Sequence, residues 1–520
     1  MKMEYKIQKG TVYLIGAGPG DLKLFTLKAK EILEQADVII YDNLVNSDSL
    51  AWCKDTAKKI FAGKTSGQHS IPQSEINELL VKEAKSESSI VRLKGGDPLI
   101  FGRANEEINA LEDSNIPYEI IPGITAAIAC AAYAGIPISE RDTSSSIIFL
   151  TGHENPEKNT LNLDFKNYAK TNATLCIYMG IGQMMRIIDE LTQGGLDPKT
   201  PVAIVENGTQ QNQRSCYGTL ETIVAQSAEQ SIKAPSIIFV GSVISLRGKS
   251  DWFESRPLFG KKIVVPRSRQ QAGQLTQLLK FYGAEVIEIP FINILPKYDK
   301  ATITDVFAEI ASYEWIIFTS ANGVHYFFDL FFKAFEDLRS IGLTRIAAVG
   351  NATAKEVKAL NLKVDLIPES ANANALGDAL IANESLDNTK ILLITGDKNS
   401  DTLYKRLEGE GRAIVDRLTL YKNNKPDLSK SKAFQDFKET GADAVLFTSS
   451  STVNHYAEAI KSLDLTNVKN PVFGSIGALT SQTLKKQGMP IDFESPKANL
   501  EHFVVETIAH FKKSKPKSNS

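Results

Sequence analysis

The stretch VYLIGAGPGD, residues 12–21, decides how the first part of the chain folds. A strand-like apolar run breaks into three glycines at alternate positions and leads into a helical pattern, which is typical of an α/β unit with a ligand at the turn. The dinucleotide-binding fingerprint, however, needs a third glycine where this chain has Asp21. Pro19 also removes a backbone donor, so the turn suits a cationic or zwitterionic ligand better than pyrophosphate. A purely structural turn is the alternative.

Short runs rich in Val, Ile and Leu alternate with amphipathic stretches along the chain, which predicts an α/β fold with mainly parallel strands. The strands expected within residues 12–241 are VYLIG, ADVIIYD, SIVRLKG, SIIFLTG, ATLCIYMG, PVAIVENG and PSIIFVG. A compositional break follows at LRGKSDWFESRPLFGKK, and the strand KIVVPR begins a second series. We therefore expect a domain boundary near residues 250–260.

The second series contains an internal repeat. WIIFTSANGVHY, which begins at Trp315, recurs as AVLFTSSSTVNH, which begins at Ala444, so that Phe318 corresponds to Phe447. Nearly the same step relates AAVGNATAKEVKALNLKV to GSIGALTSQTLKKQGMPI, and KKIVVPR to TKILLIT. Two related α/β units are therefore predicted, with a ligand cleft between them. A duplication kept only for stability is the alternative.

Bulk composition narrows the class of protein. A formal net charge of −2 over 520 residues gives no global electrostatic case for nucleic acid or an anionic membrane as partner. The four cysteines form no CxxC pair and the six histidines stand singly, so we expect neither a metal site nor a disulfide framework. The N-terminal residues lack the pattern of a signal peptide, and the apolar stretch 124–138 is too short for a membrane span. A cytoplasmic protein is expected.

A second motif, VRLKGGDPLIFGR at residues 91–103, is more specific than the first. A strand runs into two glycines, which permit close backbone approach to a ligand, and Asp97 can accept hydrogen bonds from ligand amino or hydroxyl groups. Arg103 follows six residues later. IIPGITAAIACAAYAGIP then supplies another strand-end turn, followed by small residues that leave room for a ligand.

These motifs, together with ADVIIYDNLV, GQHSIPQSEIN, TGH, YMG and VENGT, resemble the tetrapyrrole methylases over residues 10–250, and most closely the uroporphyrinogen-III C-methyltransferases. The resemblance implies two α/β subdomains, a homodimer formed through this half, and a tetrapyrrole substrate. It also implies that S-adenosylmethionine is bound between the subdomains and leaves as S-adenosylhomocysteine. The implied cofactor contacts are Pro19, Gly95, Gly96, Asp97, Ile100, Thr125, Ala126, Met179 and Gly208.

The same resemblance implies catalytic roles for Asp42, Lys64 and Arg103. The pyrrole N–H must lose a proton as a ring carbon gains a methyl group, and Asp42 is the candidate to assist that loss. Lys64 and Arg103 are candidate anchors for the substrate carboxylates. The non-catalytic alternatives are a turn cap for Asp42 and solvated surface charges for Lys64 and Arg103. Asn43 and Thr65 stand where the family commonly has arginine, so two basic residues are missing from the expected substrate rim.

The second half resembles the uroporphyrinogen-III synthases over residues 261–510, through IVVPRSR, the two FTS strands, AVGNATA, LTLYKN and IGALTSQTL. The resemblance implies two α/β subdomains, 261–295 plus 423–510 and 296–422. We expect residues 251–260 to be a linker and 511–520 a disordered tail.

These synthases close hydroxymethylbilane with inversion of ring D and loss of water. Folding the polyacid and assisting the departure of hydroxide are then the main tasks of the protein. Tyr421 matches the family tyrosine proposed for that assistance. The candidate substrate contacts are Arg267, Ser320, Asn322, Thr353, Ser449, Ser450 and Thr480. Helix capping is the alternative for the serines and threonines among them.

The expected product of the second half is the expected substrate of the first. The sequence therefore predicts a bifunctional enzyme that makes uroporphyrinogen III and methylates it twice to precorrin-2, on a route to sirohaem or cobalamin. One alternative is an active methylase with a non-catalytic, tetrapyrrole-binding second half. Another is a methylase of a later corrin precursor or of RNA, although the near-neutral charge argues against RNA.

Overall fold

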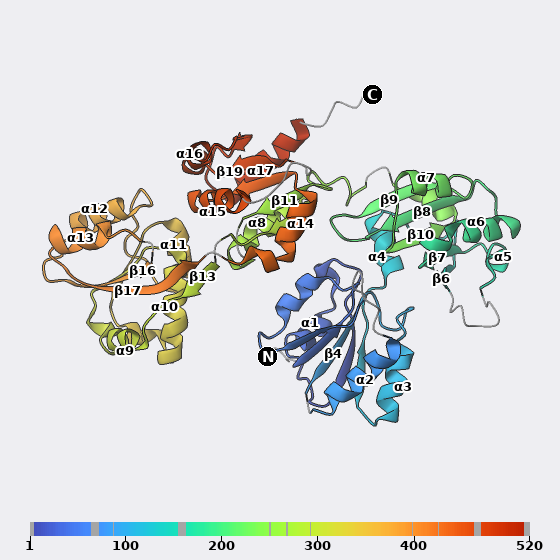
Figure 1. Ribbon diagram of the computed structural model, residues 1–520, viewed down its shortest axis with the longest axis horizontal. Helices are drawn as coiled ribbons and strands as arrows, with labels where there is room; N and C mark the ends of the chain where they lie inside the picture. Colours follow the sequence, from blue (N-terminus) through green and yellow to red (C-terminus); the bar gives the residue numbers. More distant parts are fainter. Residues whose placement is uncertain are drawn as a thin grey trace. The chain divides into compact units, whose positions relative to one another are not determined.

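The chain folds into two compact units (Figure 1). The structure is a computed structural model that describes residues 5–63, 72–86, 88–153, 163–248, 251–266, 269–291, 293–397, 399–424, 426–461 and 470–513. The first unit is Met1–Lys262 with Gln277–Glu285 and Ile508–Ser520, and the second is Ile263–Thr276 with Val286–Thr507. None of the helices in the described part of the chain has the length and apolarity needed to span a bilayer.

The first sheet has the order β3-β2-β4-β1-β5, and every pairing in it is parallel. Its strands are β1 (Val12–Gly16), β2 (Val38–Tyr41), β3 (Lys58–Phe61), β4 (Ile90–Lys94) and β5 (Tyr118–Ile121). The helices connecting them are α1 (Leu27–Leu33), α2 (Gln73–Ala84) and α3 (Ala104–Asp113). The parallel α/β arrangement expected for this part is confirmed.

Alternation along the strands sends side chains to opposite faces of this sheet. Tyr13 and Ile15 of β1 pack in the cluster that includes α1, whereas Leu14 packs in the cluster that includes α2 and α3. Figure 1 shows α1 on one side of β4, and α2 and α3 on the other. Ile90 of β4 belongs to the α2 and α3 cluster, so Arg92 and Lys94, two and four residues later, point toward the same face.

The second sheet has the order β6-β7-β10-β8-β9. Its strands are β6 (Ile147–Thr151), β7 (Thr174–Tyr178), β8 (Pro201–Glu206), β9 (Arg214–Thr219) and β10 (Ser236–Val240). The helices of this part are α4 (Ala126–Tyr133), α5 (Phe165–Tyr168), α6 (Met184–Gln193) and α7 (Ile223–Glu229). Only β6 and β7 pair in parallel, because β10 runs antiparallel to β7 and β8, and β9 runs antiparallel to β8. The prediction of mainly parallel strands is wrong here, since β8 passes to β9 through a short loop with no crossover helix.

The segment 251–260, expected to be a linker, is packed against the first unit. The indole Nε1 of Trp252 donates to the carbonyl of Ala132 at 3.0 Å, and the rings of Tyr133 and Phe253 lie 4.6 Å apart. Phe253 and Leu258 are buried. These apolar side chains hold the segment to α4, because leaving them in water would be unfavourable.

The second unit contains two sheets, with the strand orders β12-β11-β18-β19-β20 and β13-β17-β16-β14-β15. The same succession of strands and helices recurs in both, and their central strands pair in parallel. The first sheet's strands are β11 (Lys262–Val265), β12 (Glu285–Glu288), β18 (Ala444–Phe447), β19 (Val472–Ser475) and β20 (Phe493–Glu494). The second sheet's strands are β13 (Asn293–Pro296), β14 (Trp315–Phe318), β15 (Arg345–Ala348), β16 (Lys390–Gly396) and β17 (Ile414–Asn424). The helices are α8 (Arg269–Phe281), α9 (Lys300–Ala308), α10 (Ala321–Ala334), α11 (Asn351–Ala359), α12 (Ala373–Asn383), α13 (Thr402–Gly409), α14 (Lys432–Thr440), α15 (Ser450–Ile460), α16 (Ala478–Lys486) and α17 (Leu500–Lys513). The last residues of α8 and α17, 277–281 and 508–513, fall in the first unit.

The internal repeat is confirmed: β14, α10, β15 and α11 correspond to β18, α15, β19 and α16, and both strand pairs are parallel. Two expected boundaries shift. β13 pairs with β17, so residues 293–295 belong to the second of these sheets. α17 runs to Lys513, so the first three residues of the expected tail are helical, and 514–520 lie outside the described residues.

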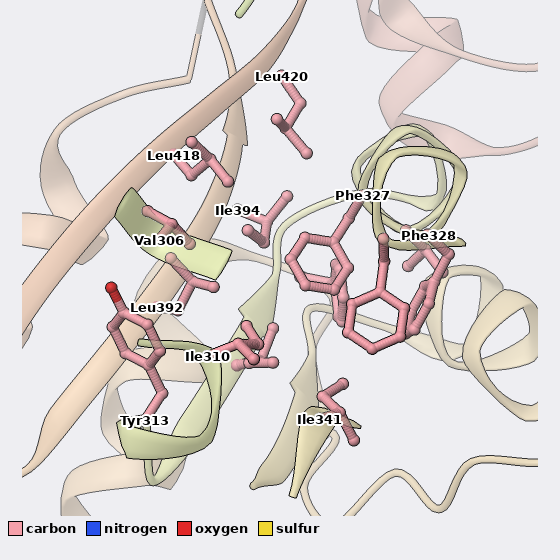
Figure 2. Close-up of a cluster of buried hydrophobic side chains, with 14 of the residues drawn as sticks. Val306, Ile310, Tyr313, Phe327, Phe328, Ile341, Leu392, Ile394, Leu418 and Leu420 are labelled. Carbon is pink, nitrogen blue, oxygen red and sulfur yellow. The ribbon is translucent and has the colours of Figure 1, made fainter. Parts of the chain in front are cut away.

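A large aromatic and aliphatic cluster fills the space between α10 and the sheet of β14, β16 and β17. Figure 2 shows Phe327 and Phe328 of α10 near Ile394 of β16. Leu420 of β17 joins the same cluster, and so does Tyr421, whose ring stacks on that of Tyr326 with centroids 5.9 Å apart. The position of Tyr421 is therefore set by a rigid core.

Candidate active sites

Three glycines bring the loops after β1, β4 and β5 into direct backbone contact. A Cβ on Gly123 would stand 2.2 Å from the carbonyl oxygen of Gly96, and one on Gly16 would stand 2.5 Å from the amide nitrogen of Gly123. Gly18 and Gly96 also exchange backbone hydrogen bonds of 3.1 and 2.7 Å. No other residue type fits at Gly16 and Gly123 without displacing backbone, so this contact explains the first glycine of the first motif.

Asp97 clamps two of these loops. Its Oδ1 accepts a hydrogen bond from the amide of Leu99 at 2.9 Å, and its Oδ2 accepts one from the amide of Gly123 at 3.1 Å. Both carboxylate oxygens of Asp97 therefore accept hydrogen bonds that fix the conformation of these loops. Gly95 beside it packs on the loop that follows β2, since a Cβ there would stand 2.6 Å from Cβ of Leu44.

The N-terminus of α4 is tied to the second sheet through Tyr178. The Tyr178 hydroxyl lies 2.6 Å from Oγ1 of Thr125 and accepts from the amide of Ala127 at 3.0 Å. Burial raises the pKa of Tyr178, so the phenol keeps its proton at neutral pH. Gly208 packs on the same helix, where a Cβ would stand 2.2 Å from Sγ of Cys130.

Asp21, the residue that breaks the dinucleotide fingerprint, joins the first sheet's loop to the second sheet's loops. Its amide donates to Oγ1 of Thr209 at 3.0 Å, and its carboxylate accepts from the hydroxyl of Tyr133 at 2.7 Å. Burial, together with the hydrogen bond to Asp21, raises the pKa of Tyr133. The nine predicted cofactor contacts thus lie on or beside loops that these contacts tie together.

Several of the same loops hold non-glycine residues in the left-handed backbone region. The φ angles are 52° at Phe101, 56° at Arg103, 54° at Met179, 48° at Asn207 and 69° at Thr209. Such conformations are uncommon for all of these residue types except asparagine, and they gather at functional sites. Met179 is also half exposed, although its neighbour Tyr178 is buried. The strain supports a ligand site where the two sheets of the first unit meet.

Asp42 lies directly after β2 and is held from two sides. Its Oδ1 accepts from the amide of Leu44 at 3.0 Å, which is the turn cap considered as the alternative. Its Oδ2 lies 3.8 Å from Nη2 of Arg92, whose side chain is only 4% exposed, whereas that of Asp42 is 25% exposed. The structure therefore shows a capping aspartate that also ends a buried ionic cluster and reaches solvent.

The other two predicted catalytic residues of this half are Arg103 and Lys64. Arg103 holds Glu106 through Nε and Nη2, each 2.7 Å from a carboxylate oxygen, and its side chain is 60% exposed. A substrate carboxylate would have to compete with Glu106 for this guanidinium. Lys64 lies outside the described residues.

In the second unit the structure brings two predicted residues together, Ser320 and Tyr421. Their hydroxyl oxygens lie 2.8 Å apart, and Ser320 also caps α10 by accepting from the amide of Gly323 at 3.0 Å. Burial raises the pKa of Tyr421, partly offset by Ser320. Asn322 follows in the first turn of α10, and Thr353 is buried in α11.

Three further predicted residues, Ser449, Ser450 and Thr480, lie at the start of α15 and in α16, the helices that follow β18 and β19, and no hydrogen bond among the described residues joins them to Tyr421. Ser449 caps α15 through the amide of Thr452 at 3.4 Å. The hydroxyl of Ser450 donates to the carbonyl of Leu479 at 3.1 Å, and Thr480 is buried. Arg267 lies outside the described residues.

A polar cavity of about 220 Å³ opens beside β14 and β16. Thr319, Asn399 and Arg417 line it, with Oγ1 of Thr319 accepting from Nδ2 of Asn399 at 2.7 Å. Ligands of α/β sheets commonly bind where parallel strands end, and this cavity lies beside the carboxyl ends of β14 and β16.

Comparison with known proteins matches each half to a family. The model of the tetrapyrrole (corrin/porphyrin) methylases matches residues 11–224, and that of uroporphyrinogen-III synthase HemD matches residues 273–505. The porphyrin biosynthesis protein HemD of Ruminiclostridium josui is 36% identical over 93% of this chain and 95% of its own length. The chain belongs to the fused tetrapyrrole methylases and uroporphyrinogen-III synthases.

Two further relatives are named as methyltransferases. The uroporphyrinogen-III C-methyltransferase of Bacillus subtilis (strain 168) is 37% identical over 71% of this chain and 76% of its own length. A crystal structure of uroporphyrin-III C-methyl transferase from Thermus thermophilus, complexed with S-adenyl homocysteine, is 33% identical and covers 45% of this chain and 99% of its own, with a TM-score of 0.39. The union of the two families in one chain places the protein in tetrapyrrole biosynthesis.

Sequence reasoning missed four buried polar groups beside the candidate site residues of the first unit, namely Arg92, Lys94, Glu107 and Tyr178. The signal was present in VRLKG, because two cations stand at alternate positions of an otherwise apolar strand. Charged residues in a fully buried strand need an ionic partner. The partner, Glu107, lies in the next helix, where only the fold shows that it faces β4.

Proposed function

We propose that the chain converts hydroxymethylbilane to uroporphyrinogen III and methylates this product twice to precorrin-2. The observation that carries the proposal is the fusion itself, since a synthase half would make the substrate of the methylase half. The product would feed the formation of sirohaem or cobalamin. The domain bounds we propose are 10–250 for the methylase and 261–510 for the synthase.

The methylase half would hold S-adenosylmethionine on the loops around Gly16, Gly96 and Gly123. The fit rests on Gly96, because a Cβ there would meet nothing closer than the Ala126 amide nitrogen at 3.8 Å, whereas Gly16 and Gly123 pack on backbone and shape the loops. The remaining contacts would be Pro19, Gly95, Asp97, Ile100, Thr125, Met179 and Gly208. The cofactor supplies a methyl group on a sulfonium and leaves as a neutral thioether.

Asp42 would accept the pyrrole N–H proton as the ring carbon gains its methyl group. Its carboxylate reaches solvent, and its loop packs on Gly95 through Leu44, so it lies beside the proposed cofactor loop. Arg103 and Lys64 would bind carboxylates of the porphyrinogen. Positioning supplies most of the rate, because the transfer is an in-line displacement.

In the synthase half Tyr421 would donate a hydrogen bond to the departing hydroxide. The phenol is protonated at neutral pH and can therefore donate a hydrogen bond, and burial raises its pKa further. Ser320 orients the phenol, and Thr353 and Thr480 would line the substrate cleft with Asn322, Ser449, Ser450 and Arg267. A homodimer through the methylase half and a cytoplasmic location complete the proposal, the latter supported by four buried, unpaired cysteines.

The purified full-length chain, incubated with hydroxymethylbilane, tests both activities. Without S-adenosylmethionine the type III isomer of uroporphyrinogen should form, and with it precorrin-2 should appear, as read by chromatography of the oxidised products and by absorbance. Finding only the type I isomer in both tubes would contradict the synthase activity. Adding ready-made uroporphyrinogen III then tests the methylase by itself.

A second candidate function keeps the methylase and makes the second half a tetrapyrrole-binding module. It is favoured by the capping roles of Ser320 and Ser449, which account for both serines without catalysis. Tyr421→Phe separates the two readings. The variant should lose type III product if the half is a synthase, whereas an unchanged isomer ratio would support the binding module.

A further inference from the structure

Four ionisable side chains form one cluster at the carboxyl ends of β2 and β4. Glu107 of α3 accepts from Nε of Arg92 at 2.9 Å, and from Nζ of Lys94 at 2.9 and 3.0 Å. Arg92 then reaches Asp42 at 3.8 Å. Arg92, Lys94 and Glu107 are 4, 5 and 0% exposed, so Asp42 is the only member with appreciable access to solvent.

Stability alone gives little reason for such a cluster. Removing charges from water costs several kcal/mol per ion, and well-packed apolar residues commonly stabilise a core as well or better. The penalty is visible at Lys94, whose pKa is lowered by burial and by the neighbouring Arg92. A fold that keeps two cations and a carboxylate beneath its sheet edge therefore has another use for them.

The geometry singles out Arg92 among the three buried groups. Its guanidinium binds Glu107 on one side and faces Asp42 on the other, and it donates to the carbonyl of Leu93 at 3.2 Å. Lys94 binds Glu107 but makes no contact with Asp42 among the hydrogen bonds and ion pairs of the described residues. A planar guanidinium held at several points is a rigid support, because each contact removes a rotation of the side chain.

We propose that Arg92 is a positioning residue for methyl transfer, which holds the Asp42 carboxylate in one orientation while Glu107 fixes Arg92 from behind. The proposal rests on the proposed function of Asp42 as proton acceptor. The amide of Leu44 fixes one carboxylate oxygen, and Arg92 would restrain the other. The charged groups facing Asp42 are thus Arg92 directly, and Lys94 and Glu107 behind it.

Full-length variants test this with uroporphyrinogen III and S-adenosylmethionine as substrates. Arg92→Met should lower the single-turnover rate of methylation about 100-fold, because misplacing a reacting group by about 1 Å has that effect. The Kd for S-adenosylmethionine, measured by calorimetry, should stay within about twofold of that of the unaltered chain, since Arg92 does not line the cofactor loops. Arg92→Lys should recover part of the rate.

Lys94→Met is the matched control, because it also removes a buried cation from Glu107 but leaves Arg92 against Asp42. Its rate should fall no more than about threefold. Equal losses in Arg92→Met and Lys94→Met, or a matching rise in the Kd for the cofactor, would show that the cluster only maintains structure and would overturn the proposal.

A double variant separates this proposal from the proposed function. If Arg92 acts through Asp42, then Arg92→Met combined with Asp42→Asn should be no slower than Asp42→Asn alone. Multiplying losses would overturn the positioning role. Full activity in Asp42→Asn would instead refute Asp42 as the proton acceptor, whereas a slow Asp42→Asn beside a fast Arg92→Met would refute the role of Arg92 only.

Discussion

The carboxyl edges of two sheets, that of β1 and β4 and that of β14 and β16, are built in different ways. In the first, loops meet backbone to backbone at Gly16, Gly96 and Gly123. In the second, a capping serine, Ser320, and a buried tyrosine, Tyr421, supply the polar groups. Backbone contact demands glycine and leaves a strong motif, whereas a cap accepts several residue types and leaves a weak one.

The two halves also place ion pairs at opposite ends of their strands: Arg92 and Glu107 are buried, whereas Arg345 and Glu384 are 36 and 30% exposed. Arg92 and Glu107 lie toward the carboxyl end of β4, next to the candidate site. Arg345 and Glu384 lie at the amino end of β15, where Glu384 also accepts from Trp315 at the start of β14. Since ligands of parallel sheets bind at carboxyl ends, we assign the first pair to function and the second to stability.

Among the variants that test this comparison, Gly123→Ala should have the largest effect on stability and activity. The new methyl group would overlap the Gly96 carbonyl and destabilise the first unit by about 3 kcal/mol. Displacing the loops should also lower methylation about 100-fold. Calorimetric unfolding and a methylation assay measure both effects. Gly182→Ala is the control, because a Cβ at that exposed position meets nothing within 4 Å; equal behaviour of the two variants would refute the backbone contact.

Ser320→Ala and Ser449→Ala compare equivalent positions of the repeat, and their effects should be smaller. Each loses a helix cap, which costs about 1 kcal/mol. Only Ser320→Ala also deprives Tyr421 of its partner, so this variant should lower formation of the type III isomer more than Ser449→Ala does, by about tenfold. Urea unfolding and isomer analysis provide the measurements. A synthase defect that is the same in both would place the chemistry away from Tyr421.

Glu384→Gln should have the smallest effect and should change stability without changing synthase activity. The guanidinium of Arg345 and the indole of Trp315 hold the pKa of Glu384 below its ordinary value near 4.5. A carboxyl pKa that is lowered by folding stabilises the folded state at pH values above the ordinary pKa. This stability is lost as the pH falls through the folded-state pKa. The variant should therefore be about 1 kcal/mol less stable at pH 7, with the difference vanishing in acid.

Unfolding curves from pH 7 to pH 3 measure this difference. Glu314→Gln is the matched control, since Glu314 stands 4.0 Å from the same Arg345 and is 55% exposed. A stability loss that persists unchanged at low pH would show that packing, and not charge, explains the role of Glu384.

The sequence by itself determined the α/β class, the internal repeat and the glycine loops. Each of these depends on local rules, since strand and helix periods, and turns that only glycine fits, can be read from neighbouring residues. The offset between Phe318 and Phe447 predicted equivalent strands, and β14 and β18 confirm it. The tetrapyrrole families were predicted from the same local motifs.

Only the tertiary structure decided which side chains meet. The antiparallel pairing of β10 with β7 and β8, the packing of Trp252 and Phe253 on α4, and the contact of Asp21 with Tyr133 join residues far apart in the chain. The link from Glu107 through Arg92 to Asp42 is of the same kind. Burial makes such contacts obligatory, because a charge removed from water must find a partner, but which partner it finds depends on how the chain folds.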